Sequence, residues 1–202
     1  MGQAEAALLS RVATHFAESA QLKRDASQVL GAPVVRAGIL LADALRAGGK
    51  ALACGNVGSA ADAQHFAAEL VNRFEIERPP LAAVALSTDT STLTAIANDF
   101  AYQHVFSKQV RALGRRGDVL LAISTSGNSA NVVEAVHAAH QTGLRVIGLA
   151  GNTGGKLLAL LTGDDVGICV PHTNTARIQE VHLLVLHCLC DAIDFQLFGA
   201  KA

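Results

Sequence analysis

From Lys50 onward the chain alternates between short apolar runs and segments long enough to form helices. Strands without polar positions are typical of a parallel sheet that is covered on both faces, and their alternation with helices indicates an α/β fold. We therefore predict a five-stranded parallel sheet flanked by helices. The expected strands are Ala51–Cys54, Ala82–Leu86, Val119–Ile123, Val146–Leu149 and Val166–Val170.

The remaining elements are predicted as helices, because their apolar residues recur at helical spacing. The first ~47 residues are interpreted as a pair of helices, broken near Gly31-Ala32-Pro33 by residues that disfavour a continuous helix. Residues 1–202 then form one domain, with N-terminal helices at 1–47 that serve oligomerisation and an α/β core with a final helix at 48–202. The helices expected in that core are Ala60–Phe74, Ser91–Leu113, Ala130–Thr142, Gly155–Leu161 and Thr175–Phe198.

The composition restricts the partners of the protein. Hydrophobic residues make up 50% of the 202 residues, and charged residues only 16%. A surface with so few charges is difficult to keep soluble as a monomer, so we expect a homo-oligomer that buries part of it. The net charge of −1 lacks the basic patch of a nucleic-acid-binding protein, and we expect no direct contact with nucleic acid.

The cysteines and the apolar stretches indicate the cellular compartment. The four cysteines (Cys54, Cys169, Cys188 and Cys190) contain no C-x-x-C pair, and reduced thiols are typical of a cytoplasmic protein. The first residues lack the basic start and apolar run of a signal peptide. No stretch reaches about 18 apolar residues, so we expect no membrane span.

Small polar residues follow three of the predicted strands. In an open parallel sheet, ligands bind at the carboxyl ends of the strands. This rule selects Gly55–Ser59, Ser87–Asp89 and Ser124–Ser129 as candidate ligand loops. Ser87–Asp89, like the pair Asn98-Asp99, can also be explained as turn and cap residues.

The loop STSGNS at 124–129 is the strongest of these candidates. Its four hydroxyls, together with the N–H groups at the start of the helix that follows, suit a phosphate group. A simple N-cap is the alternative, because Ser and Asn are favoured caps. Four hydroxyls within six residues favour an anion site. No Gly-Lys-Ser/Thr follows, so the loop is not a P-loop.

Two further segments carry residues that can bind a metal. His65 and Glu69 lie four residues apart on a predicted helix and project from one face, as a shared ligand pair or as a solvated polar pair. Gln179, His182 and His187 interrupt the otherwise apolar last helix, and Gln179 and His187 lie two turns apart on roughly one side. Imidazole and carboxylate groups both suit zinc, but sequence spacing cannot show that the two helices meet.

Several ordered motifs resemble the sugar isomerase (SIS) domain family. They are GNxGSAADAQH, NRFEIERP, LTAIANDF, STSGNS and RIQEVHLLVLH, and the resemblance runs from about residue 35 to the C-terminus. It implies a five-stranded parallel, flavodoxin-like three-layer fold and a homotetramer with active sites across subunit boundaries. It also implies the interconversion of sedoheptulose 7-phosphate and D-glycero-D-manno-heptose 7-phosphate, a step toward the heptose of lipopolysaccharide.

The resemblance also assigns roles to individual residues. It implies that zinc, one ion per subunit, is held by His65, Glu69, Gln179 and His187, and that Glu69 and His187 are the catalytic acid–base pair. The residues implied to contact the substrate are Asn56, Val57 (through its backbone), Gly58, Ser59, Glu69, Asn98, Asp99, Ser124, Thr125, Ser126, Ser129 and Gln179.

Two points stay open at this stage. A related branch of the family is a non-catalytic scaffold that associates with the replication initiator, and it shares several motifs; the presence of both Glu69 and His187 favours the enzyme. Val57 stands where the family usually has glycine. If this position needs a positive φ, a β-branched residue is strained there; we expect instead that only its backbone N–H is required, with the side chain narrowing the pocket.

Overall fold

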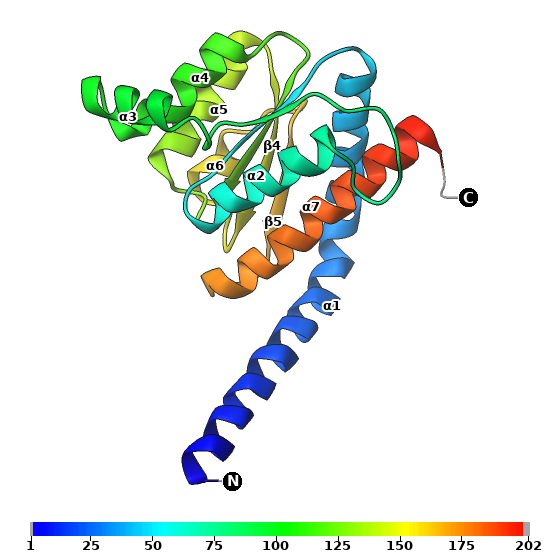
Figure 1. The fold of residues 1–202 in the computed structure, drawn as a ribbon, viewed down its shortest axis with the longest axis vertical. Coiled ribbons are helices and arrows are strands. Elements are labelled where there is room, and N and C mark those ends of the chain that lie inside the picture. Colours follow the sequence, from blue (N-terminus) through cyan, green and yellow to red (C-terminus); the bar gives the residue numbers. More distant parts are fainter. Residues whose placement is uncertain (1, 200–202) are drawn as a thin grey trace.

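A computed structural model describes residues 2–199, and its centre is a sheet of five parallel strands (Figure 1). The strands lie in the order β2-β1-β3-β4-β5. All five predicted strands are present, with ends that agree with the prediction or differ by one or two residues. Their bounds are β1 Ala51–Cys54, β2 Ala83–Ala85, β3 Val119–Ser124, β4 Arg145–Gly151 and β5 Val166–Val170.

The helices connect the strands and cover both faces of the sheet. The expected helix over 91–113 is wrong as a continuous element, because the chain leaves helical angles at Phe100 and Ala101. Asn98 and Asp99 precede this break, and such side chains compete for backbone hydrogen bonds and weaken a helix. The elements are α1 Gln3–Arg46, α2 Gly58–Val71, α3 Thr90–Asp99, the 3₁₀ turn η1 Tyr102–His104, α4 Val105–Leu113, α5 Ala130–Thr142, α6 Gly155–Ala159 and α7 Thr175–Phe198.

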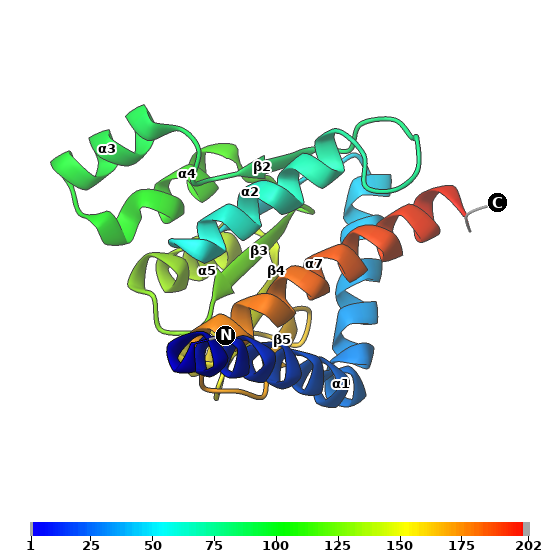
Figure 2. The same cartoon turned by 60° about the horizontal axis from the view of Figure 1, so that its bottom comes forward.

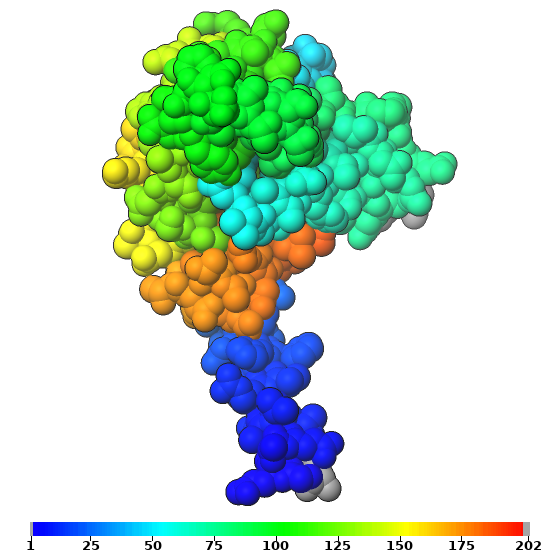
Figure 3. Space-filling view, turned by 60° about the vertical axis from the view of Figure 1, so that its left-hand side comes forward, coloured from blue at the N-terminus to red at the C-terminus, as the bar shows by residue number. Residues whose placement is uncertain are grey.

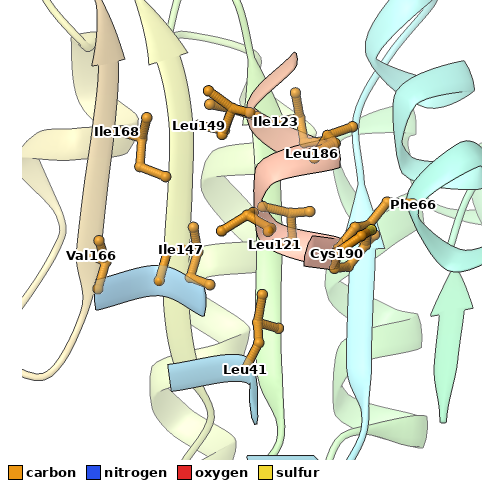
Figure 4. Close-up of a cluster of buried hydrophobic side chains, with 14 of the residues drawn as sticks. Leu41, Phe66, Leu121, Ile123, Ile147, Leu149, Val166, Ile168, Leu186 and Cys190 are labelled. Atoms are coloured by element: carbon orange, nitrogen blue, oxygen red, sulfur yellow. The ribbon is translucent and has the colours of Figure 1, made fainter. Parts of the chain in front are cut away.

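Alternate residues of the strands face two separate apolar clusters. On β3, Leu121 and Ile123 pack with α1, α2 and α7, whereas Leu120 packs with α4 and α5. Figure 4 shows the first cluster, with Phe66 of α2 and Leu186 of α7 beside the strands. Fully burying a side chain of this size contributes about 1.5–3 kcal/mol. This packing holds α2 and α7, which carry the metal-ligating candidates, on the same face of the sheet.

The predicted N-terminal helical pair is wrong, because α1 is one helix that runs through Pro33. Its axis changes direction partway along (Figures 1 and 2), which is the usual response of a helix to an internal proline. The second half packs on the body, and the first half projects from it (Figure 3). The projecting half exposes large apolar residues: Leu8, Leu9, Val12 and Phe16.

Two helices, α1 and α7, are long and apolar enough to span a membrane by length and composition alone. In α7 the apolar residues have another explanation, since Val181, Leu186 and Ile193 are buried in the cluster against the sheet. Core helices of globular proteins commonly pass the same test.

The sheet order places a crevice at the ends of β1 and β3. The chain passes from β1 to β2 on one side and then returns to β3 on the other side. In the flavodoxin-like order 2-1-3-4-5, this reversal leaves a ligand-binding crevice at the carboxyl ends of the two central strands. The loops Gly55–Ser59 and Ser124–Ser129 lie at this point.

Candidate active site

The loops that follow β1 and β3 are joined by a network of side-chain amides. Asn56 and Asn131 exchange two hydrogen bonds of 2.8 Å, and the hydroxyl of Tyr102 donates to Asn56 Oδ1 at 3.1 Å. Asn131 is buried, and an amide pair at such a site satisfies groups that would be costly to leave alone. The network fixes the first ligand loop against the start of α5.

In the STSGNS loop, the serine before α5 does not form a simple side-chain cap. Ser129 occupies the N-cap position of α5 but makes no side-chain capping bond; its Oγ lies 3.0 Å from Ser124 Oγ instead. Gly127 adopts φ 67°, and a Cβ there would collide with the carbonyl oxygen of Gly154. The loop therefore keeps hydroxyls and the positive end of the α5 dipole together, which suits a phosphate group.

The two helices that carry the metal-ligating candidates run side by side in the same direction (Figure 2). His65 Nε2 of α2 lies 2.9 Å from His187 Nε2 of α7, and the two rings pack edge to face. Glu69 Oε1 lies 3.5 Å from His65 Nε2, and its side chain is 21% exposed. Phe74, from the loop after α2, stacks on the His187 ring. The structure thus brings three of the four expected residues together.

The fourth residue, Gln179 of α7, packs against Gly58 at the start of α2. A Cβ on Gly58 would collide with the Gln179 side-chain amide. Glycine at position 58 is therefore needed for the close approach of the two helices, as well as for the loop. Asp62, one turn before His65, has a buried Oδ2 without a hydrogen-bond partner in residues 2–199. Burial raises the pKa of Asp62 to about 6, and the nearby His65 opposes the shift.

The donor set fits a zinc ion in its chemistry. Among residues 2–199, no group of three or more His, Cys, Asp or Glu side chains already has a metal-binding arrangement. Nevertheless, His187 Nε2 and Glu69 Oε1 both lie within 3.5 Å of His65 Nε2. Two ligands of a tetrahedral zinc ion lie about 3.3 Å apart, given Zn–N bonds of 2.0–2.1 Å. The two separations from His65 Nε2 are therefore close to the spacing between two zinc ligands.

The expectation for Val57 is wrong in its backbone conformation. Val57 adopts φ 52° and ψ −117° at the N-cap of α2, a region that favours glycine. A β-branched residue is strained there. The residue is 93% exposed, so its side chain does not narrow a pocket within this chain. The strain is held in place by hydrogen bonds of the surrounding turn, among them Ser59 N–H to the carbonyl of Asn56.

Asn98 and Asp99 are not brought to the histidine pair within one chain. Both are exposed at the end of α3, where Asn98 Nδ2 donates to Asp99 Oδ1 at 2.8 Å. Helix α3 lies at the periphery of the molecule and has no buried residue (Figures 1 and 2). Asp89 caps this helix by accepting a hydrogen bond from the N–H of Thr92, as the structural interpretation of the Ser87–Asp89 turn predicts.

Sequence reasoning missed the residues that join the parts of the site. Asn131 lies just inside a predicted helix after a stronger motif, and only its position two residues after Ser129 could have drawn attention to it. Tyr102 is the single tyrosine of the chain, but its contact with Asn56 spans 46 residues. Neither residue has a local pattern that reveals its partner.

Comparison with known proteins agrees with this architecture. Residues 14–151 match the SIS domain. A phosphoheptose isomerase of Aromatoleum aromaticum is 63% identical over 194 residues, which cover 96% of this chain and 98% of that relative. The structure of phosphoheptose isomerase GmhA from Neisseria gonorrhoeae is 59% identical, with a TM-score of 0.88, over 93% of this chain and 98% of that one. A phosphoheptose isomerase structure from Francisella tularensis is 44% identical, with a TM-score of 0.89, over 92% and 97% of the two chains.

These relatives match nearly the whole chain, so the matched span includes the segments that carry the candidate site. The domain match covers the loops after β1 and β3, and the full-length relatives extend it to α7 with Gln179 and His187. The chain belongs to the SIS domain family and, within it, to the phosphoheptose isomerases.

Proposed function

We propose that this protein is an aldose–ketose isomerase that converts sedoheptulose 7-phosphate to D-glycero-D-manno-heptose 7-phosphate. The observation that carries the proposal is the contact between His187 and the His65–Glu69 pair, in a chain 63% identical to a phosphoheptose isomerase. We further propose that the product enters the synthesis of lipopolysaccharide heptose in the cytoplasm. The four cysteines, all free thiols, are compatible with that compartment.

The reaction moves a proton between C1 and C2 of the sugar through an enediol, so it requires a base and an acid. We propose that the Glu69 carboxylate transfers the proton between the two carbons and that the His187 imidazole protonates the oxygen. A positioned acid or base of this kind contributes roughly 10²–10⁴-fold in rate. His187 is also our candidate for opening the sugar ring.

The phosphate end of the substrate is assigned to the crevice between β1 and β3. There Ser124, Thr125, Ser126 and Ser129, with the backbone of Asn56–Ser59, offer hydroxyl and N–H donors. Binding energy from a group remote from the reacting carbons can be used to orient those carbons. His65, Glu69, Gln179 and His187 would hold Zn²⁺, which when bound would polarise the substrate carbonyl.

A homotetramer with shared active sites is the proposed assembly. The apolar residues exposed on the projecting half of α1 favour burial against another copy. The exposed position of Asn98 and Asp99 at the end of α3 is consistent with a role in a site completed by a neighbouring subunit. The scaffold alternative gives no reason for His65, Glu69 and His187 to converge, so the enzyme is favoured.

The direct test is to incubate the purified protein with sedoheptulose 7-phosphate and zinc and to follow the aldose by NMR. Turnover by the wild type, absent in Glu69→Gln, would support the proposal. A folded wild-type protein that does not turn over the substrate with zinc present would refute it. Binding to the replication initiator without turnover would establish the scaffold instead.

A further inference from the structure

An arginine from the loop after α2 joins the two helices of the site. The Arg78 side chain is 1% exposed, although Arg78 lies in the segment between α2 and β2, which forms no helix or strand. Its Nε donates to Asp194 Oδ1 of α7 at 2.8 Å. Its terminal nitrogens donate to the carbonyl oxygens of Glu69 at 2.8 Å and Leu70 at 2.7 Å. A guanidinium can make this set of contacts because its five donors have a fixed planar geometry.

The carbonyls that Arg78 binds belong to the last turn of α2. Carbonyl groups at the C-terminus of a helix have no partner within the helix, and the end of the helix dipole there attracts a cation. One of these carbonyls is that of Glu69, whose side chain is the assigned base. Arg78 therefore fixes the backbone from which the catalytic carboxylate extends.

The carboxylate that binds Arg78 belongs to Asp194, which lies on α7 seven residues after His187. Asp194 is buried, and its Oδ2 has no hydrogen-bond partner in the described residues. The same loop places Phe74 against the His187 ring, with centroids 5.6 Å apart. Arg78 thus anchors a loop that contacts one catalytic residue and binds the backbone of the other.

We infer that Arg78, held by Asp194, is a positioning residue that sets Glu69 against His187 for proton transfer. Three contacts in register join α2 and α7: Gly58 with Gln179, His65 with His187, and the Glu69 carbonyl with Asp194 through Arg78. The last is the only one of the three made by a charged pair. A small shift of α2 along α7 would leave the fold intact and separate the two reacting groups, because catalytic geometry tolerates little displacement.

The inference rests on the proposed isomerase activity, and it is tested with a variant that removes the charges together. Arg78→Met alone leaves Asp194 buried and unpaired, which can unfold the protein for reasons unrelated to catalysis. The double variant Arg78→Met/Asp194→Leu removes both charges, and such replacements often restore stability. We expect it to fold with a Tm near that of the wild type, a kcat lowered about 10–100-fold as for other supporting contacts, and a KM changed less than about threefold, because the phosphate loop is untouched.

Arg78→Lys is the second variant, and it keeps the charge while losing the planar fork. Assayed at a temperature where circular dichroism shows it folded, it should lose about tenfold in kcat. Lys50→Met is the matched control. It breaks the part-buried Lys50–Asp118 ion pair at the opposite end of the strands and should lose stability without losing kcat.

Nitrogen-15 NMR of the histidine rings provides a readout that does not depend on turnover. The ring nitrogens of His65 and His187 should shift in Arg78→Lys and not in Lys50→Met. An inactive wild type would refute the proposed function while this readout still tests the positioning role. Wild-type kcat in the double variant, or unchanged ring nitrogens in Arg78→Lys, would overturn the inference.

Discussion

Acidification should destabilise the protein through His182, a buried histidine of α7. Its side chain is fully buried, and its Nε2 lies 3.1 Å from the carbonyl oxygen of Ala150 on β4. Since a carbonyl only accepts, Nε2 carries the proton of the neutral ring. Nδ1 has no partner among residues 2–199, so a second proton there would be buried without a hydrogen bond. Burial lowers the pKa of His182 to about 4, although the bond to Ala150 opposes the shift.

The size of the effect follows from linkage. The unfolded chain binds the second proton near pH 6.5, and the folded protein binds it only near pH 4. The stability contributed by neutral His182 is therefore complete above pH 6.5 and is lost as the pH falls toward 4. The full difference of about 2.5 pKa units corresponds to about 3 kcal/mol, of which about 2 kcal/mol falls between pH 7 and pH 5. Typical domains are stable by only about 5–15 kcal/mol.

Urea unfolding of wild type and His182→Gln between pH 8 and pH 5, at one protein concentration, measures this contribution. The glutamine amide can donate to Ala150 but does not titrate. The wild-type free energy of unfolding should fall by about 2 kcal/mol more than that of the variant between pH 7 and pH 5. Asp62, with its pKa raised to about 6, acts in the opposite direction but is present in both proteins. Parallel pH dependences for the two proteins would refute the reasoning.

Three other changes test the site. Glu69→Gln should lower kcat at least about 10²-fold with an unchanged oligomer by light scattering, and retained turnover would contradict its role as base. Val57→Gly should raise the free energy of unfolding by about 1 kcal/mol in urea unfolding, because it relieves the backbone strain. Substrate affinity measured by calorimetry should stay the same, since the exposed side chain narrows no pocket within the chain; weaker binding would mean that the Val57 side chain makes a favourable contact. Ser129→Ala should raise KM about tenfold in steady-state kinetics, with little effect on kcat, because it removes one hydroxyl of the phosphate loop. Ser107→Ala is the control: Ser107 is buried on α4, and its replacement should leave KM unchanged.

The sheet could be predicted from sequence because its strands are short, apolar and regularly spaced. The length of α1 could not. Gly31-Ala32-Pro33 has the local signature of a break, but Leu30 and Ala37 are buried in the same cluster on either side of Pro33. Burial of that continuous face offsets the hydrogen bond that the proline removes. Local propensity was overridden by packing that only the tertiary structure reveals.

The candidate site divides in the same way. The four-residue spacing of His65 and Glu69 and the eight-residue spacing of Gln179 and His187 correctly predict which residues share a helix face. The positive φ of Val57 is not indicated by the valine itself; only the glycine that is usual at this position in the family pointed to it. The bond between Asn56 and Asn131 spans 75 residues and depends on the strand order.

What periodicity leaves undetermined is the register of α2 along α7, and the catalytic geometry depends on it. Each helix presents its polar residues on a predictable face, but a displacement of one turn, about 5.4 Å, would separate His65 from His187 without exposing the apolar faces. Because Gly58 has no side chain, the first turns of α2 and α7 can lie close together. Arg78 connects the last turn of α2 to Asp194 of α7 through its hydrogen bonds. A site divided between two parallel helices has to be fixed at both ends. Gly58 and Arg78 therefore share one role, which is to fix the register of the two helices. Neither residue would be chosen as catalytic from its own chemistry.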